Sequence, residues 1–347
     1  MEFVTPSSPH LHGENGVKIV MFQVIVALLP GTFVMWWLLG WGIIINISLA
    51  CATAVLSEWF FVKSRGRDPR FAVSDLTAVV TAWLLALALP PLLPWWQTVL
   101  GSAFSIVIAK QLFGGIGYNT FNPAMAGYVL LIISFPASMS QWLTLSNISD
   151  NNISFSETLK TIFSSKLPES KTWDAITSAT PLDAVKTQLT QNQMISEIRD
   201  NTMWGDFTGY GWEWISYAFL LGGILLLWRK VINWRIPISF LGSLFLISCI
   251  FWMIDPELNP SPGFHLFSGA AILGAFFIAT DPVSASTTPR GQLIYGALIG
   301  LLIYIIRTWG GYPDAVAFAV LLVNMAVPMI DQYTQPKVFG VEKIKSD

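Results

Sequence analysis

The sequence predicts an all-α polytopic membrane protein with about ten transmembrane helices. Of its 347 residues 53% are hydrophobic and only 12% are charged, about half the charged share of a soluble domain. Apolar runs long enough to cross a hydrocarbon core of about 30 Å recur along the chain. Sixteen Trp residues suit a chain that has two membrane–water interfaces to anchor.

The expected spans follow one another with a single long interruption. They lie near residues 20–39, 41–62, 74–93, 96–113, 122–137, 212–228, 236–254, 264–280, 293–310 and 314–330. Several are short or contain Pro or Gly, and the fifth and the last have the weakest pattern. The chain divides into an N-terminal tail (1–19), a first membrane part (20–137), a polar loop (138–211), a second membrane part (212–330) and a C-terminal tail (331–347).

The distribution of Lys and Arg predicts the orientation. Cytoplasmic segments of membrane proteins are enriched in these residues, whereas long loops cross the membrane largely regardless of charge. With the N-terminus in the cytoplasm, the cytoplasmic segments hold Lys18, Lys63, Arg65, Arg67, Arg70, Lys110, Arg229, Lys230, Arg235, Arg290, Lys337, Lys343 and Lys345. We therefore expect both termini in the cytoplasm and the 138–211 loop outside.

The two membrane parts show a weak internal similarity. FGGIGYNTFNPAMAGYVLL (113–131) follows the fourth span, and WGGYPDAVAFAVLLVNMAVP (309–328) follows the ninth. Each places Gly-Gly before an apolar helix. Because five spans is an odd number, two halves of five spans would be inverted repeats, which often hold ligands where broken helices meet.

Two cytoplasmic connectors, GGIGYNTFNPAM (114–125) and ATDPVSASTTPRGQ (279–292), are unusually polar for their position. Asn119 and Asn122 offer donors and acceptors for an uncharged heterocycle or a polyol. Asp281 and the hydroxyl-bearing residues after it offer further hydrogen-bonding groups. The alternative is that these segments are ordinary connectors in which Asn122 and Asp281 cap helix ends. Water channels need two Asn-Pro-Ala boxes and this chain has one, which disfavours that class.

Several chemistries find little support in the sequence. The sequence shows no basic face of the kind that nucleic-acid-binding proteins carry. Three scattered His residues do not predict a metal site, and Cys51 and Cys249 are expected to be small core residues. The intramembrane charges fall near span ends, so the chain alone predicts no carboxylate relay across the bilayer. The N-terminus lacks the pattern of a cleaved signal peptide.

The segment DAITSATPLDAV (174–185) is the most distinctive part of the long loop. Small residues and Pro181 flank Thr180, so its hydroxyl is open to a modifying enzyme. Asp174, six residues upstream, could orient or deprotonate that hydroxyl. The alternative is an ordinary turn, since loops collect Ser, Thr and Pro.

DAITSAT resembles the attachment signal of bacterial flavin transferases, which move FMN from FAD onto the final Thr through a phosphoester bond. In this chain that residue is Thr180, and Asp174, Thr177, Ser178 and Ala179 form the recognition run; the signal often has Gly where Ser178 stands. Together with both connectors and the ten-span layout, the sequence is similar to the D subunit of the Rnf ion-translocating oxidoreductase complex. It is also similar to the related B subunit of the sodium-pumping NADH:quinone reductase.

The resemblance implies two inverted five-helix repeats, as in urea-transporter-like channels, and covalent FMN on Thr180. It also implies a noncovalent riboflavin near Asn119, Asn122 and Asp281. The partners it implies are a flavin transferase and other subunits of the complex, including a second covalent-flavin subunit and iron–sulfur subunits. The expected function is an inner-membrane electron-transfer subunit that is not a complete enzyme alone. The alternatives are a small-solute channel or transporter, and a scaffold that positions partners.

Overall fold

The computed structural model describes residues 16–145, 153–167, 171–199 and 204–336. The outer parts of the two predicted tails, residues 1–15 and 337–347, lie outside the described residues. The described chain is helical apart from its connections and two isolated β-bridges. The prediction of an all-α polytopic membrane protein is confirmed.

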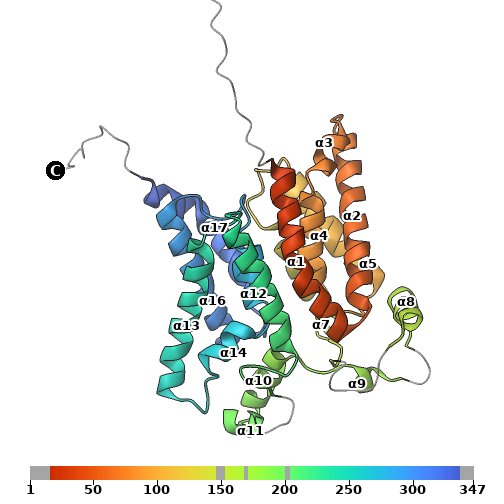
Figure 1. Cartoon of the computed structure of the whole chain (residues 1–347). Coiled ribbons are helices and arrows are strands. Elements are labelled where there is room, and N and C mark those ends of the chain that lie inside the picture. The colour runs from red at the N-terminus through yellow and green to blue at the C-terminus, as the bar shows by residue number, and fades with distance from the viewer. Residues whose placement is uncertain (1–15, 146–152, 168–170, 200–203, 337–347) are drawn as a thin grey trace, which may run out of the picture.

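The helices form two groups that are joined by the long loop (Figure 1). The first group contains α1 (Val17–Leu39), α2 (Gly42–Ser64), α3 (Pro69–Ser74), α4 (Thr77–Leu87), α5 (Trp95–Phe104), the π-helix η1 (Ser105–Gln111) that continues α5, α6 (Pro123–Ser134) and α7 (Pro136–Met139). The loop carries α8 (Phe155–Ser164), α9 (Trp173–Ile176), α10 (Pro181–Thr190) and α11 (Ile195–Arg199). The second group contains α12 (Trp212–Trp228), α13 (Arg235–Ile254), α14 (Pro262–Phe267), α15 (Ala271–Leu273), its π-helical continuation η2 (Gly274–Ile278), α16 (Pro289–Trp309) and α17 (Val316–Thr334).

Within the described residues, five helices are long and apolar enough to cross a membrane, namely α1, α2, α13, α16 and α17. Helices α4, α6 and α12 are apolar but shorter. The third span, predicted over 74–93, is a helix only over Thr77–Leu87. Pro90, Pro91 and Pro94 follow it, and proline lacks the N–H that would continue a helix. The eighth span, predicted over 264–280, is broken between α14 and α15.

The two groups have the same order of elements. Each has two helices of 17 to 23 residues, a six-residue helix, a half-length helix (α4, or α15 with η2), a longer helix and a final helix after Gly-Gly. A left-handed residue precedes the half-length helix in each, Leu76 with φ 64° and Gly269 with φ 62°. The first helix of each group, α1 and α12, begins at opposite ends of the molecule (Figure 1). The order and direction of the elements agree with inverted repeats, which stay a prediction in their detail.

Five helices begin with the same local signal, a polar cap followed by proline. The side chains of Asp68, Asn122, Thr180, Ser261 and Thr288 each accept a hydrogen bond from a backbone N–H in the first turn of the helix that follows. These N–H groups have no partner inside the helix, and proline at the first helical position is already fixed near the helical φ. The cap at Thr180 fixes this residue at the start of α10.

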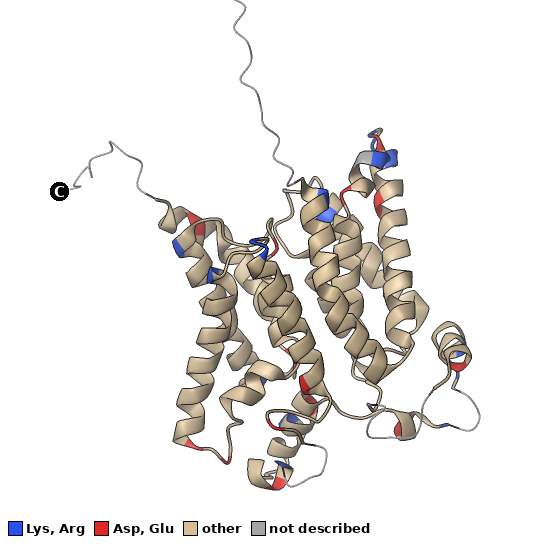
Figure 2. Ribbon diagram, viewed as in Figure 1, with Lys and Arg blue, Asp and Glu red and all other residues tan. Residues whose placement is uncertain are grey.

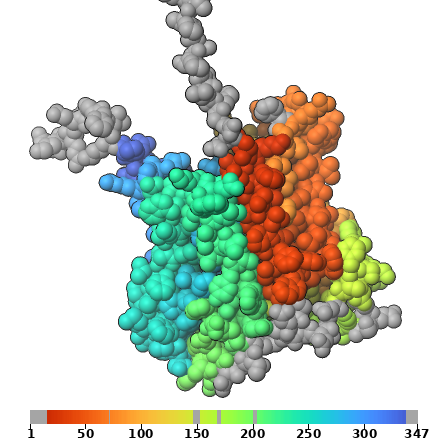
Figure 3. Space-filling model, in the orientation of Figure 1, coloured from red at the N-terminus to blue at the C-terminus, as the bar shows by residue number. Residues whose placement is uncertain are grey.

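The two groups meet along α1 and α12, which pack closely side by side (Figure 3). A Cβ on Gly222 would overlap the carbonyl oxygen of Ala27, and one on Gly31 would overlap the ring of Phe219. Glycine is therefore needed at both positions because the helix backbones approach so closely.

Helices α8 to α11 lie at one end of the molecule, and the described chain begins and stops at the other (Figure 1). Lys and Arg gather largely at this second end, whereas the helices between the ends carry few charges (Figure 2). We call the two ends the loop side and the terminus side. The assignment of the terminus side to the cytoplasm stays a prediction.

Each group buries one cation near the end of its fifth helix. Lys110 donates to Glu58 Oε1 and to Thr77 Oγ1, both at 2.6 Å, and Thr77 is the first residue of α4. Arg307 donates to the carbonyl oxygens of His265 at 2.6 Å and Ser268 at 3.0 Å, just before α15. Both cations thus stabilise the start of a half-length helix.

Candidate functional sites in two cavities

A cavity of about 480 Å³ opens on the loop side, within the size range of small-molecule sites. We call it the loop-side cavity. Thr180 lines it, together with residues from both membrane groups. Its mostly apolar and aromatic walls include Met35, Leu87, Met125, Tyr128, Ile132, Trp142, Trp212, Ile215, Phe219, Leu273, Tyr312 and Val316. Trp142 and Trp212 contact each other edge to face, with ring centroids 5.7 Å apart.

Thr180 is half-buried at the start of α10 and makes a reciprocal contact with Asp183. Its Oγ1 accepts a hydrogen bond from the Asp183 backbone N–H at 3.3 Å and donates to Asp183 Oδ2, also at 3.3 Å. Burial raises the pKa of the Asp183 carboxyl above its ordinary value, although the Thr180 hydroxyl and the Lys186 ammonium act in the opposite direction. Asp183 also lines the loop-side cavity.

The predicted recognition run lies directly before this cap. Thr177 pairs with Leu143 in an isolated β-bridge, and Ser178 N donates to the Trp142 carbonyl at 3.0 Å. Asp174 lies exposed in the short helix α9. The contact on the Thr180 hydroxyl comes from Asp183, which the sequence analysis did not single out. The pattern Thr-x-x-Asp before an apolar helix face could have indicated it, because it resembles a capping box.

Lys186 fastens α10 to the second membrane group. Its ammonium donates to the carbonyl oxygens of Arg307 at 3.2 Å, Tyr312 at 3.3 Å and Gly310. These acceptors lie at the end of α16 and in the Gly-Gly connector before α17. Since Tyr312 and Asp314 line the loop-side cavity with Thr180, Lys186 connects the helix that begins after Thr180 to a second part of the cavity wall.

A second cavity of about 350 Å³, here called the terminus-side cavity, lies toward the other end. All three candidate riboflavin residues line it: Asn119 and Asn122 before α6, and Asp281 after η2. Lys110 and Thr77 add polar groups to its wall. Most of the remaining lining is apolar, including Val17, Met21, Val24, Val80, Leu84, Ile116, Leu226, Ile232, Phe276 and Phe277.

The side chains of the three candidates are partly used within the protein. Asn122 caps α6 through Oδ1, which accepts from Met125 N at 3.2 Å, and its Nδ2 donates to the Ile278 carbonyl at 3.2 Å. Asn119 Nδ2 donates to the Phe121 carbonyl at 3.0 Å. Asp281 Oδ2 accepts from the backbone and hydroxyl of Ser284 at 3.1 and 2.6 Å.

The hydroxyl-bearing residues after Asp281 hold the connector in place. Ser286 and Thr287 donate to the carboxylate of Asp331 on α17, and Thr288 caps α16. The capped-connector interpretation therefore accounts for Asn122 and for much of 279–288. It does not exclude a ligand, since Asn119, Asn122 and Asp281 still border one cavity.

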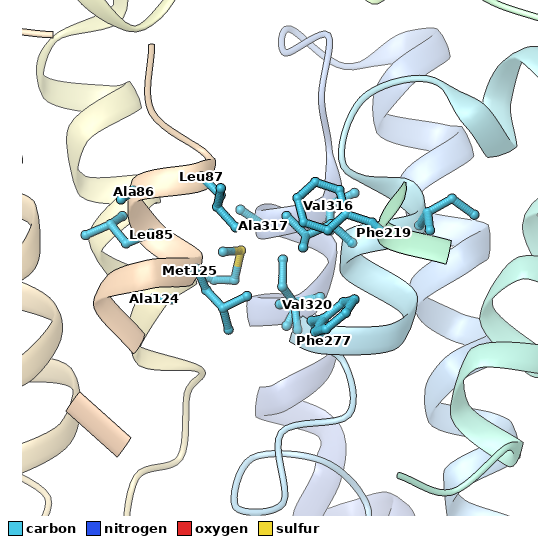
Figure 4. Packing of buried hydrophobic residues seen from close by; sticks show 14 of the residues in the cluster. Leu85, Ala86, Leu87, Ala124, Met125, Phe219, Phe277, Val316, Ala317 and Val320 are labelled. Carbon is cyan, nitrogen blue, oxygen red and sulfur yellow. The ribbon is translucent and has the colours of Figure 1, made fainter. Parts of the chain in front are cut away.

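Buried apolar side chains lie where the linings of the two cavities adjoin, and we call them the apolar layer; Figure 4 shows several of them. Ala124 lines the terminus-side cavity and the next residue, Met125, lines the loop-side cavity. Phe277 and Ile278 are divided in the same way. Leu87, Val316 and Ala317 close the layer from α4 and α17. Residues that are neighbours in sequence therefore line different cavities, so the two cavities lie close together.

The fold and this pair of cavities define a polytopic membrane protein with a small-molecule-sized chamber at each end of its membrane domain. The chain belongs to the NQR2, RnfD, RnfE family, whose model matches residues 4–340. It is 50% identical to the D subunit of the ion-translocating oxidoreductase complex of Aeromonas hydrophila, over 98% of this chain and 99% of the relative. The corresponding subunits of Aliivibrio salmonicida and Alcanivorax borkumensis are 49% and 50% identical, over 99% and 98% of this chain and 100% and 97% of those relatives.

Proposed function

We propose that this chain is a membrane subunit of a multi-subunit ion-translocating oxidoreductase, as the names of its relatives state for them. In this proposal it passes electrons across a bacterial inner membrane, between covalent FMN on Thr180 and a noncovalent riboflavin in the terminus-side cavity. Other subunits of the complex supply and remove the electrons, and a flavin transferase attaches the FMN.

The observation that carries the proposal is that Thr180, the expected attachment residue, borders a cavity of about 480 Å³. A flavin ring is a large, flat and mostly apolar heterocycle, so the Trp, Tyr and Phe walls suit it. The phosphoester would lie at the N-terminus of α10, where backbone N–H groups and the helix dipole favour an anion. Asp183 is the unfavourable neighbour, because a second negative charge there would repel the phosphate.

The terminus-side cavity has the complementary features expected for riboflavin. Most of its lining is apolar, and the two polar connectors contribute Asn119, Asn122 and Asp281. Amide and carboxylate groups can bond the polar edge of the ring and the ribityl chain. Lys110 borders the same cavity and is held by Glu58 and Thr77, so its position is fixed before any ligand arrives.

The apolar layer between the cavities favours an electron path over a solute path. The buried side chains of Met125, Phe277 and Val316 are apolar and do not replace the water of a hydrated ion or a sugar-like solute. Electrons need no such partners. Bound flavins supply the electron-accepting and electron-donating chemistry, while this chain positions them, excludes water and keeps the layer closed.

The first experiment is in-gel fluorescence of the full chain after denaturation in SDS. The chain is produced with a flavin transferase, and wild type is compared with Thr180→Val and with Thr187→Val, an exposed threonine two turns further along α10. We expect fluorescent bands for wild type and Thr187→Val and none for Thr180→Val. A dark wild-type band, with the transferase active on another acceptor, would remove the covalent-flavin proposal.

The noncovalent flavin requires a separate measurement. Flavin released from native Thr180→Val protein by acid is identified by chromatography, since this variant lacks the covalent group. We expect riboflavin from the Thr180→Val protein and less of it from the double variant Thr180→Val/Asn119→Leu. Uptake of a small solute into vesicles without any redox donor would instead support the transporter alternative.

A further inference from the structure

Helix α8 in the long loop has three distinct faces rather than two. At about 100° per residue, Thr158, Thr161 and Ile162 form one face, and all three are buried against the first membrane group. Phe155, Leu159 and Phe163 form the second face, and Ser156, Lys160, Ser164 and Glu157 form the third, polar face. Each face occupies about a third of the helix circumference or less.

The second face is apolar and open. Its side chains Phe155, Leu159 and Phe163 are 50%, 39% and 51% exposed. They recur every four residues, so they form one continuous stripe along the helix. A stripe of large apolar side chains in water is unfavourable, and it marks an interaction surface.

Two tryptophans at the loop-side ends of membrane helices contact this stripe. Trp41, which directly precedes α2, meets the ring of Phe155 with centroids 5.4 Å apart. Trp95, the first residue of α5, stacks on Phe163 with centroids 6.2 Å apart. Both tryptophans are themselves partly exposed. Exposed Trp at span ends marks the level of the membrane–water interface.

The placement of α8 agrees with that level. In Figure 1 the long helices run along the page, whereas α8 is seen nearly end-on beside the lower end of α5, so its axis lies across theirs. In Figure 3 it projects from the side of the first group at the loop side. Helix α2, which extends from the level of α8 toward the terminus side (Figure 1), has apolar exposed residues, Ile44, Leu56 and Phe60 among them.

We propose that α8 lies in the corner between the protein wall and the surface of the loop-side leaflet. One face packs on the protein, the Phe155–Leu159–Phe163 stripe enters the boundary between headgroups and acyl chains, and the Ser156–Lys160–Ser164 face meets water. Interfacial helices combine a polar face and an apolar face with low overall hydrophobicity, as α8 does. The partner is therefore lipid, and the apolar stripe provides the contact, because Lys160 and Glu157 leave the polar face without net charge.

The stripe is a membrane anchor for the segment that leads to Thr180. The lipid-bound α8 would hold the start of the long loop at a fixed depth and beside the first membrane group. This inference does not depend on the flavin proposal, because it uses only the faces of α8 and its contacts with Trp41 and Trp95.

Spin labels on neighbouring positions test the proposal. The full chain, with Cys51→Ala and Cys249→Ala, receives one cysteine at a time as Leu159→Cys, Lys160→Cys, Phe163→Cys or Ser164→Cys. It is reconstituted in vesicles of phosphatidylethanolamine and phosphatidylglycerol. Collisions of each label with oxygen, which is concentrated in lipid, are compared with collisions with a water-soluble nickel chelate.

We expect the ratio of oxygen to nickel collisions to be several-fold higher at positions 159 and 163 than at 160 and 164. Equal nickel access at all four positions would place α8 in water and overturn the proposal. The same measurement on the assembled complex separates lipid from protein. Loss of oxygen access at 159 and 163 there would show that another subunit covers the stripe, which also overturns it. Positions 159 and 160 form one comparison and positions 163 and 164 a second, so one comparison still tests the proposal if a variant of the other does not fold.

Discussion

Replacement of Lys110 by Met would leave the carboxylate of Glu58 without its counter-charge. The side chains of Lys110 and Glu58 are only 4% and 1% exposed, and their charged atoms lie 2.6 Å apart. Gln111 Nε2 also donates to Glu58 Oε1 at 2.6 Å. After the substitution this amide would be the remaining side-chain donor to a buried anion.

The expected cost follows from this burial. Removal of one partner from a buried pair costs about 3–5 kcal/mol, because the other charge stays desolvated. An exposed pair contributes only about 0–1 kcal/mol. Met fills most of the volume of the lysine stem, so little of the loss comes from a cavity. The double variant Lys110→Met/Glu58→Gln removes both charges and should recover most of the stability, to within about 1–2 kcal/mol of wild type.

The assay is reversible unfolding in mixed micelles with increasing SDS, followed by tryptophan fluorescence. Lys18→Met is the matched control, since Lys18 lies exposed at the start of α1. A loss for Lys110→Met no larger than for this control would refute the reasoning. So would a double variant as unstable as the two single variants combined, because the two losses would then be independent.

Three further predictions concern packing, the apolar layer and pH. Gly222→Val should destabilise the protein by about 1–3 kcal/mol or more in the same assay, because the new side chain meets the Ala27 carbonyl, whereas Gly242→Val, with open space around it, should be close to neutral. Phe277→Ala should open the layer between the cavities and raise passive ion leak from vesicles; Phe245→Ala, on an exposed face, should not, and equal leak from both would contradict the assigned barrier. Burial raises the pKa of Asp183, so the folded state keeps this proton to a higher pH than the unfolded chain, and docking of α10 should weaken as pH rises above the ordinary aspartate value of about 3.9. Hydrogen exchange of the α10 amides measures this, and Asp183→Asn should flatten the dependence; an unchanged profile in that variant would assign it to another group.

Much of the fold and of the candidate sites could be predicted from local sequence patterns. Apolar runs located α1, α2, α12, α13 and α16 to within a few residues, because a helix in lipid must bond its own backbone and present apolar side chains. The Asn122-Pro123 start of α6 was visible because a cap and its helix are neighbours in sequence. The DAITSAT segment indicated Thr180 for the same reason: an enzyme that modifies a short segment recognises adjacent residues.

Only the tertiary structure decided which distant residues meet. Lys186 meets carbonyl groups of Arg307, Gly310 and Tyr312 more than a hundred residues away. Tyr312 in turn lines the same cavity as Thr180. Lys110 finds Glu58 across 52 residues. The break between α4 and α5, and the one between α14 and α15, place the cavity walls. Such pairings depend on how whole helices pack, and a local pattern of polarity does not encode that geometry. The sequence alone therefore predicted most of the long helices and indicated Thr180 as a candidate for modification, whereas packing determined the two cavities and the apolar side chains between them.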